Sequence, residues 1–150
     1  LAKEAGAHVI TTASAKNHAL LRKIGADEVI DYHTTNFAEV LADVDLVFDT
    51  MGGEVQKNSF DVLKPNTGRL VSIVGIEDKQ LAAEKNISAE SIWLQPNGEQ
   101  LQKIADLMAA GKVKSIIGEV FPFSRQGIYD AHALSETHHA VGKIVVQMAE

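Results

Sequence analysis

The sequence predicts an α/β fold with a mainly parallel sheet, and two observations lead to that class. Segments rich in β-branched residues alternate with segments whose apolar residues recur at helical spacing. A helix end followed by a glycine and then a strand occurs at Gly6 and again at Gly25, 19 residues later. That interval holds one strand and one short helix, the content of a β-α-β unit, and such units imply right-handed crossovers with helices on both faces of the sheet.

The composition of the chain narrows the range of functions that it can have. The chain has 150 residues, 45% of them hydrophobic, which is enough for a sizeable core. A formal net charge of -6 argues against a nucleic-acid partner, and no apolar run is long enough to span a membrane. The absence of cysteine removes disulfides and thiolate metal ligands. We therefore expect a cytoplasmic protein that acts on a small molecule.

The first third of the chain predicts two short strands around one helix. Residues 1–6 have the pattern of a last helical turn ended by Gly6, so we expect the natural chain to extend upstream of Leu1. A strand is expected at 8–12. Ser14 is a suitable N-cap for the helix that follows, and a second strand is expected after Gly25.

The middle third continues the alternation. Residues 45–49 form a continuous apolar run typical of a strand covered on both faces, and 54–63 predict a helix. A turn at 65–68 leads to another buried strand at 69–74. Residues 76–89 are more polar and predict a connection of undefined structure.

The last third predicts two more helices and three strands. The expected strands are 91–95, 116–123 and 143–146. An amphipathic helix is expected at about 98–110, ended by Gly111, and a further helix at 125–136.

Five motifs in order carry a family resemblance. They are the stretches 25–32, 47–53, 68–75, 95–101 and 139–145. Together they resemble the cofactor half and C-terminal tail of the zinc-independent quinone-oxidoreductase-like branch of the medium-chain dehydrogenase/reductase superfamily. The resemblance covers essentially the whole chain.

The resemblance implies a Rossmann-type, doubly wound sheet. In that fold a glycine-rich loop after the first strand binds the pyrophosphate, and no G-x-G-x-x-G spacing occurs here. The first strand and its loop are therefore expected upstream of Leu1, with strands 8–12 and 45–49 bordering the gap. Either the upstream strand fills that gap, or the two flanking strands pair directly, or a neighbouring chain fills it.

The resemblance also implies a division of the chain. It makes residues 1–112 an NADP-binding domain and residues 113–150 a segment that returns to the catalytic domain of a homodimeric enzyme.

The cofactor is expected to be NADP(H). NAD-selective Rossmann sites place an acidic residue near the end of the second strand, and residues 9–16 contain none. By resemblance, Ser14, Lys16 and Tyr32 contact the 2′-phosphate of the cofactor. Each has a plainer alternative: a helix cap for Ser14, a solvated first-turn lysine for Lys16 and a sheet-edge aromatic for Tyr32.

Further cofactor contacts follow from position at the ends of parallel strands and from the resemblance. Ordinary turn chemistry is the alternative for most of them. The additional candidates are Thr50, Met51, Gly52, Val74, Gly75, Trp93, Leu94, Gly142 and Lys143. Val141 departs from the family pattern, in which a basic residue is common at this position.

The expected activity is hydride transfer from NADPH to a quinone, enone or similar carbonyl. The catalytic residues are unknown, because the substrate-binding groups are expected upstream. His138 and His139 are adjacent and would diverge, so no metal site is expected. Two alternatives remain: a zinc-dependent alcohol dehydrogenase-like enzyme, or a non-catalytic, crystallin-like nucleotide-binding module.

Overall fold

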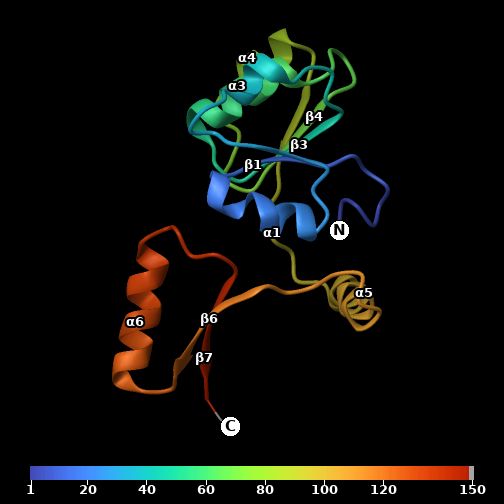
Figure 1. Cartoon of the computed structure of the whole chain (residues 1–150). Coiled ribbons are helices and arrows are strands. Elements are labelled where there is room, and N and C mark those ends of the chain that lie inside the picture. Colours follow the sequence, from blue (N-terminus) through green and yellow to red (C-terminus); the bar gives the residue numbers. More distant parts are fainter. Residues whose placement is uncertain (149–150) are drawn as a thin grey trace. The chain divides into compact units, whose positions relative to one another are not determined.

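A computed structural model describes residues 1–148, which divide into two compact units (Figure 1). One unit comprises residues 10–18 and 28–97. The other comprises residues 1–9, residues 19–27 and the chain from Gly98 onward. Seven strands alternate with helices along the described residues, which confirms the predicted α/β class with parallel strand pairing.

The first unit holds five of the strands. They form a two-stranded sheet, β1-β2, and a three-stranded sheet, β3-β4-β5, both parallel. In chain order its elements are β1 (Ile10–Thr12), η1 (Ala15–Asn17), β2 (Glu28–Ile30), α2 (Phe37–Val40), β3 (Leu46–Asp49), α3 (Gly53–Val62), β4 (Arg69–Ser72), α4 (Lys79–Glu84) and β5 (Ser88–Ser91).

Helix α1 (His18–Lys23) begins at the boundary between the units. The second unit then contains α5 (Gly98–Ala109), β6 (Ile117–Pro122), α6 (Arg125–Glu136) and β7 (Lys143–Gln147). β6 and β7 pair in parallel, and α6 is the crossover that packs against both. The prediction of a helix at 125–136 is confirmed at both ends.

The turn at residues 1–6 and the helices α1 and α5 end in the same glycine turn. At Gly6 the glycine N–H donates to the carbonyl of Lys3, and the next N–H, from Ala7, reaches back to Ala2. Gly25 and Gly111 repeat this pair of hydrogen bonds, and all three glycines have positive φ. This is the Schellman arrangement, in which a left-handed residue satisfies the last carbonyls of the helix.

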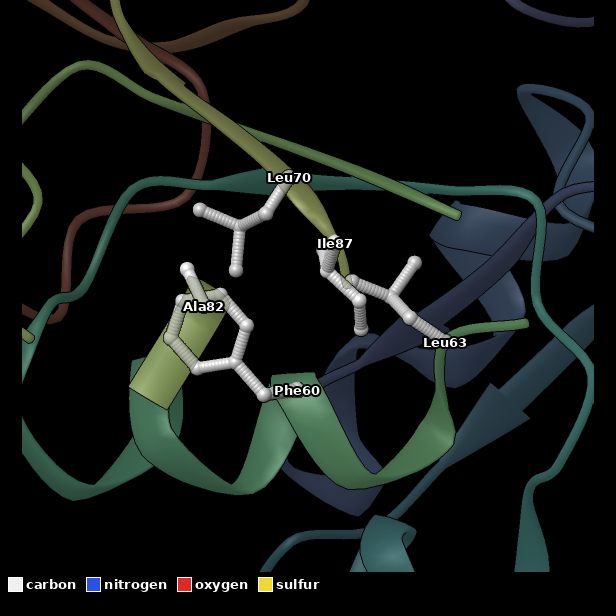
Figure 2. Close-up of a cluster of buried hydrophobic side chains, with 5 residues drawn as sticks. All are labelled: Phe60, Leu63, Leu70, Ala82 and Ile87. Atoms are coloured by element: carbon white, nitrogen blue, oxygen red, sulfur yellow. The ribbon is translucent and has the colours of Figure 1, made fainter. Parts of the chain in front are cut away.

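The apolar core of the first unit lies between β4 and the two helices α3 and α4. Phe60 of α3 and Ala82 of α4 pack beneath Leu70 of β4, next to Leu63 and Ile87 (Figure 2). These side chains are nearly or fully inaccessible to water. The core therefore fixes α3 and α4 against one face of the β3-β4-β5 sheet.

The opposite face of β3 is not covered by the described residues. Leu46 is 56% exposed and Phe48 is 58% exposed. The prediction of a strand covered on both faces is therefore wrong for residues 1–148. The neighbouring positions Val47 and Asp49 point to the helices and are more buried, which is the alternation of a half-covered strand.

β1 and β3 each have one partner among the described residues. β1 pairs with β2, β3 pairs with β4, and the two strands do not pair with each other. This is the strand order expected for a doubly wound sheet interrupted between its second and fourth strands. The alternative that the flanking strands pair directly is not what the structure shows.

The predicted strand at 91–95 is wrong. The strand in this region is β5, Ser88–Ser91, and residues 92–97 have no regular structure. The polar connection expected over 76–89 contains α4, whose N-cap Asp78 accepts a hydrogen bond from Leu81 N at 2.8 Å.

Candidate cofactor-binding site

The carboxyl end of the β1-β2 sheet carries the three residues assigned to a 2′-phosphate. Thr12 and Ile30 are paired at the ends of the two strands, and Ala13 N donates to Ile30 O at 2.9 Å. Ser14 and Tyr32 each come two residues after these ends. The structure therefore places Ser14, Lys16 and Tyr32 at one edge of one sheet.

Polar groups at this edge are free to meet an anion. Ser14 occupies the N-cap position of η1, yet its hydroxyl makes no capping bond and only accepts from Asn17 Nδ2 at 3.4 Å. Lys16 is exposed, and its ammonium has no hydrogen-bond or ion-pair partner among residues 1–148. Tyr32 is exposed and its ring lies against His33.

A carboxylate does stand near this edge, at Asp31. Its Oδ1 accepts from His33 N at 3.0 Å, so it is held in the turn that follows β2. The end of β1, where a ribose-binding acid is expected in NAD-selective sites, has none.

The second group of candidates lies at the carboxyl end of the β3-β4-β5 sheet. Asp49 and Ser72 are paired in register at the ends of β3 and β4. The loop 50–52 leads from β3 into α3 and contains Thr50, Met51 and Gly52. The loop 73–77 follows β4 and contains Val74 and Gly75. Met51 and Val74 are exposed.

Beneath these loops lies a polar network of three buried side chains that sequence reasoning missed. Asp49 is 4% exposed, Gln56 of α3 is 1% exposed and Ser72 is fully buried. Asp49 Oδ2 accepts from Gln56 Nε2 at 2.7 Å and from Ser72 Oγ at 2.8 Å. Asp49 Oδ1 accepts from Met51 N and Gly52 N, both at 3.0 Å.

The network also holds the second loop. Ser72 Oγ accepts from Val74 N at 3.1 Å, and Gln56 Nε2 donates to Gly75 O at 2.7 Å. Gln56 Oε1 accepts from Glu77 N at 3.0 Å. No buried side-chain nitrogen or oxygen within residues 1–148 lacks a hydrogen-bond partner, so the network is closed.

Hydrogen bonds keep Asp49 ionised. Burial by itself raises the pKa of this carboxyl, but the donors Gln56, Gly52, Met51 and Ser72 outweigh burial and leave the pKa below its ordinary value. The site therefore contains a buried negative charge that is solvated by protein donors.

The two loops touch each other directly. Gly53 N, in the first turn of α3, donates to the carboxylate of Glu77 at 2.8 Å. Gly52 has φ +70°, and a Cβ placed there would come within 3.0 Å of Glu77 Oε1 and 3.3 Å of Val74 Cγ2. A glycine is needed at this position both for its backbone conformation and for the close approach of the loops.

A sequence signal for this network did exist. Asp49 and Ser72 are polar residues at the ends of two consecutive apolar strands, and parallel pairing brings such ends together. Gln56 comes seven residues after Asp49, on the following helix. A polar residue at a position that is predicted to be buried is therefore a better indicator of such a network than the residue type by itself.

Trp93 and Leu94 lie just after β5. They are 89% and 82% exposed, in the irregular segment that replaces the predicted strand. They are thus available to a ligand or to another part of the protein. Within residues 1–148, no hydrogen bond joins Trp93 or Leu94 to the loops that follow β3 and β4.

Gly142 and Lys143 belong to the other unit. Gly142 precedes β7 with φ +85°, and a Cβ there would approach Ile116 O to 2.7 Å. Lys143 N donates to Ile116 O at 2.7 Å, and its side chain is exposed. Close packing of β6 and β7 therefore accounts for the glycine without a ligand.

The described residues do not fit a metal ion. No group of three or more His, Asp or Glu side chains gathers within residues 1–148, and the sequence has no cysteine. No helix within residues 1–148 is both long enough and apolar enough to cross a membrane.

The class follows from comparison with known proteins. Residues 24–146 match the family model described as zinc-binding dehydrogenase. The chain belongs to this family, within the medium-chain dehydrogenase/reductase superfamily, and corresponds to its C-terminal cofactor-binding portion.

Particular relatives and structures support the assignment. The mitochondrial NAD(P)H oxidoreductase RTN4IP1 of Danio rerio is 29% identical over 100% of this chain and 45% of its own length. The chloroplastic NADPH-dependent alkenal/one oxidoreductase of Arabidopsis thaliana is 31% identical over 92% and 33%. The solved quinone oxidoreductase of Coxiella burnetii is 36% identical with a TM-score of 0.87, over 99% and 47%.

Two consequences follow from these relatives. This chain spans less than half of their length, so it represents a portion of the enzymes that it resembles. The expectation of a cytoplasmic protein is corrected, because these relatives include mitochondrial and chloroplastic proteins.

Proposed function

We propose that the chain is the cofactor-binding portion of an NADPH-dependent oxidoreductase that reduces a quinone, an enone or a similar electrophilic carbonyl. The observation that carries the cofactor choice is the edge formed by Ser14, Lys16 and Tyr32. This edge offers a free ammonium and two hydroxyls, with no acid at the end of β1. A dianionic 2′-phosphate is the group that such donors recognise.

The rest of the proposed site follows the two halves of a doubly wound sheet, each of which takes one mononucleotide. The β1-β2 edge would hold the adenosine half. The loops after β3 and β4, with Trp93 and Leu94, would hold the nicotinamide half, which supplies the hydride when bound. We assign residues 1–112 to this domain and residues 113–150, with Gly142 and Lys143, to the segment that connects it to the catalytic domain of a homodimer.

The proposed substrate class is supported by the relatives. An NADPH-dependent alkenal/one oxidoreductase and a quinone oxidoreductase both match the chain over nine-tenths of its length or more. Both classes of substrate present an electrophilic carbon to a hydride. The described residues assign no proton donor to that reaction.

The test is steady-state kinetics on the full-length protein with a quinone or enone acceptor, comparing NADPH with NADH. The wild type should prefer NADPH. Lys16→Ala should lower kcat/KM for NADPH by a factor equivalent to about 1.5–3 kcal/mol, as expected for loss of a charged hydrogen bond. The value of kcat/KM for NADH should stay nearly unchanged.

Lys23→Ala provides the matched control, because Lys23 is an exposed lysine in the last turn of α1. Lys23→Ala should change kcat/KM for neither NADPH nor NADH. Equal use of NADPH and NADH by the wild type would refute the cofactor choice. Binding of NADPH without oxidation, across acceptors of both kinds, would instead support a non-catalytic module.

A further inference from the structure

The hydrogen bonds of the network formed by Asp49, Gln56 and Ser72 are directed mainly at two loops, which a purely stabilising role in the core would not require. Its three side chains come from β3, α3 and β4, and each lies at or near the carboxyl end of the sheet. Five of their hydrogen bonds go to backbone groups of loops 50–52 and 73–77 rather than to the core.

We propose that this network is a positioning device for the proposed cofactor site, which sets the two nicotinamide-side loops in one arrangement before the cofactor binds. The inference rests on the proposed function. Asp49 turns the N–H groups of Met51 and Gly52 inward, and Gln56 does the same to the carbonyl of Gly75.

Ser72 is the junction between the two loops. Its hydroxyl donates to the carboxylate that holds loop 50–52 and accepts from Val74 N in loop 73–77. Because Ser72 is fully buried, no water can take over both bonds without a cavity. Loss of this hydroxyl should therefore remove one of the links between the loops and loosen their arrangement, while Gln56 still bonds Asp49 and the carbonyl of Gly75.

The network serves only the second half of the sheet. None of its hydrogen bonds reaches Ser14, Lys16 or Tyr32, which follow the ends of β1 and β2. A positioning role therefore predicts a split. Binding of the nicotinamide half should depend on Ser72, and binding of the adenosine half should not.

The experiment measures the affinity of the full-length protein for NADPH and for adenosine 2′,5′-bisphosphate, which lacks the nicotinamide half. Ser72→Ala should weaken NADPH by about tenfold and leave adenosine 2′,5′-bisphosphate unchanged. The control is Ser59→Ala, which removes another buried hydroxyl, 3% exposed, that donates to Val55 O within α3. It should change neither affinity.

Asp49→Asn provides a second variant if Ser72→Ala does not fold. The amide keeps the shape and can still accept from the two loop N–H groups, but its nitrogen faces the donors of Gln56 and Ser72. It should give the same split between the two ligands.

Equal weakening of both ligands, or no change in NADPH affinity, would show that the network is merely structural and would overturn the inference. A wild-type protein that binds neither ligand would overturn the proposed function, and this inference with it. The two failures are therefore distinguishable.

Discussion

Asp27 joins two glycine turns of the second unit by a single carboxylate. Its Oδ2 accepts from Val9 N at 2.7 Å, and both of its oxygens accept from Lys3 Nζ at 2.9 Å. The backbone N–H of Val9 and the ammonium of Lys3 hold the pKa of Asp27 below its ordinary value. Its bonds therefore favour the folded state whenever the carboxyl is ionised.

The pH dependence of this contribution has a definite sign. A lowered folded-state pKa stabilises above the ordinary carboxyl pKa of about 4, and that stabilisation is lost as the pH falls through the lowered value. Asp27→Asn should lower the thermal midpoint at neutral pH, and its difference from the wild type should close on acidification. Melting curves at several pH values check this.

Asp61→Asn is the control, because Asp61 forms an exposed ion pair with Lys85 that contributes little to the free energy of unfolding. It should change the thermal midpoint little at any pH. A difference between wild type and Asp27→Asn that stays constant down to about pH 2 would contradict the assigned cause.

At the residue scale, the proposed cofactor contacts stay predictions, whereas the buried polar network is a feature that the structure adds. The family resemblance grouped Ser14, Lys16 and Tyr32, and the structure places all three after the paired ends of β1 and β2. The ends of β3 and β4 indicate that Asp49 and Ser72 meet, but the full network with Gln56 could not be recognised, because its contacts depend on strand register and on the phase of α3. Those are tertiary features that residue type does not encode.

Two serines at helix N-caps provide a test at the element scale. Ser124 accepts from Gly127 N at 3.0 Å and caps α6, whereas Ser14 makes no capping bond at η1. Ser124→Ala should cost about 1 kcal/mol of unfolding free energy. Ser14→Ala should cost less than about 0.5 kcal/mol.

Chemical denaturation of the full-length protein measures both costs. The comparison also separates the two interpretations of Ser14. A loss at Ser14 as large as that at Ser124 would favour the plain helix cap over a cofactor contact.

Most predicted elements, including strands β3, β4, β6 and β7, lie within two residues of their expected bounds, whereas β5 was misplaced and α4 was not predicted. Helix α6 has a cap at Ser124 and apolar residues at helical spacing, and it matches its predicted bounds. β5 was placed too late in the chain, because Ile92 and Trp93 have high strand propensity. The ladder instead selects Ser88–Ser91, which pairs residue for residue with β4 and buries only Ala89 to any extent.

At the scale of the whole molecule, the main feature is that the sheet is interrupted between β1 and β3. The strand order on both sides of this interruption agrees with the order that the family resemblance implied, whereas the exposure of Leu46 and Phe48 was not predicted. A continuous apolar run indicates that a strand can be buried on both faces, but another segment must supply the cover.

The last prediction concerns a polypeptide of residues 1–150 alone. It lacks a pyrophosphate-binding glycine loop, and β1 and β3 each have one unpaired edge within the described structure. This polypeptide should bind NADPH far more weakly than the intact enzyme and show no reductase activity. Calorimetric titration decides the matter: micromolar binding by the isolated polypeptide would show that the glycine loop is dispensable.

The pairing pattern also has a consequence for how the protein folds. Every strand pair within residues 1–148 joins strands that are consecutive in sequence, and the glycine turns that end the helices are local as well. Each β-α-β unit can therefore close early, at low loop entropy, even while the chain is being synthesised. Joining the β1-β2 sheet to the β3-β4-β5 sheet, through the strand that the family resemblance implies between them, would be a separate, non-local event. We expect it to be the slow step of folding.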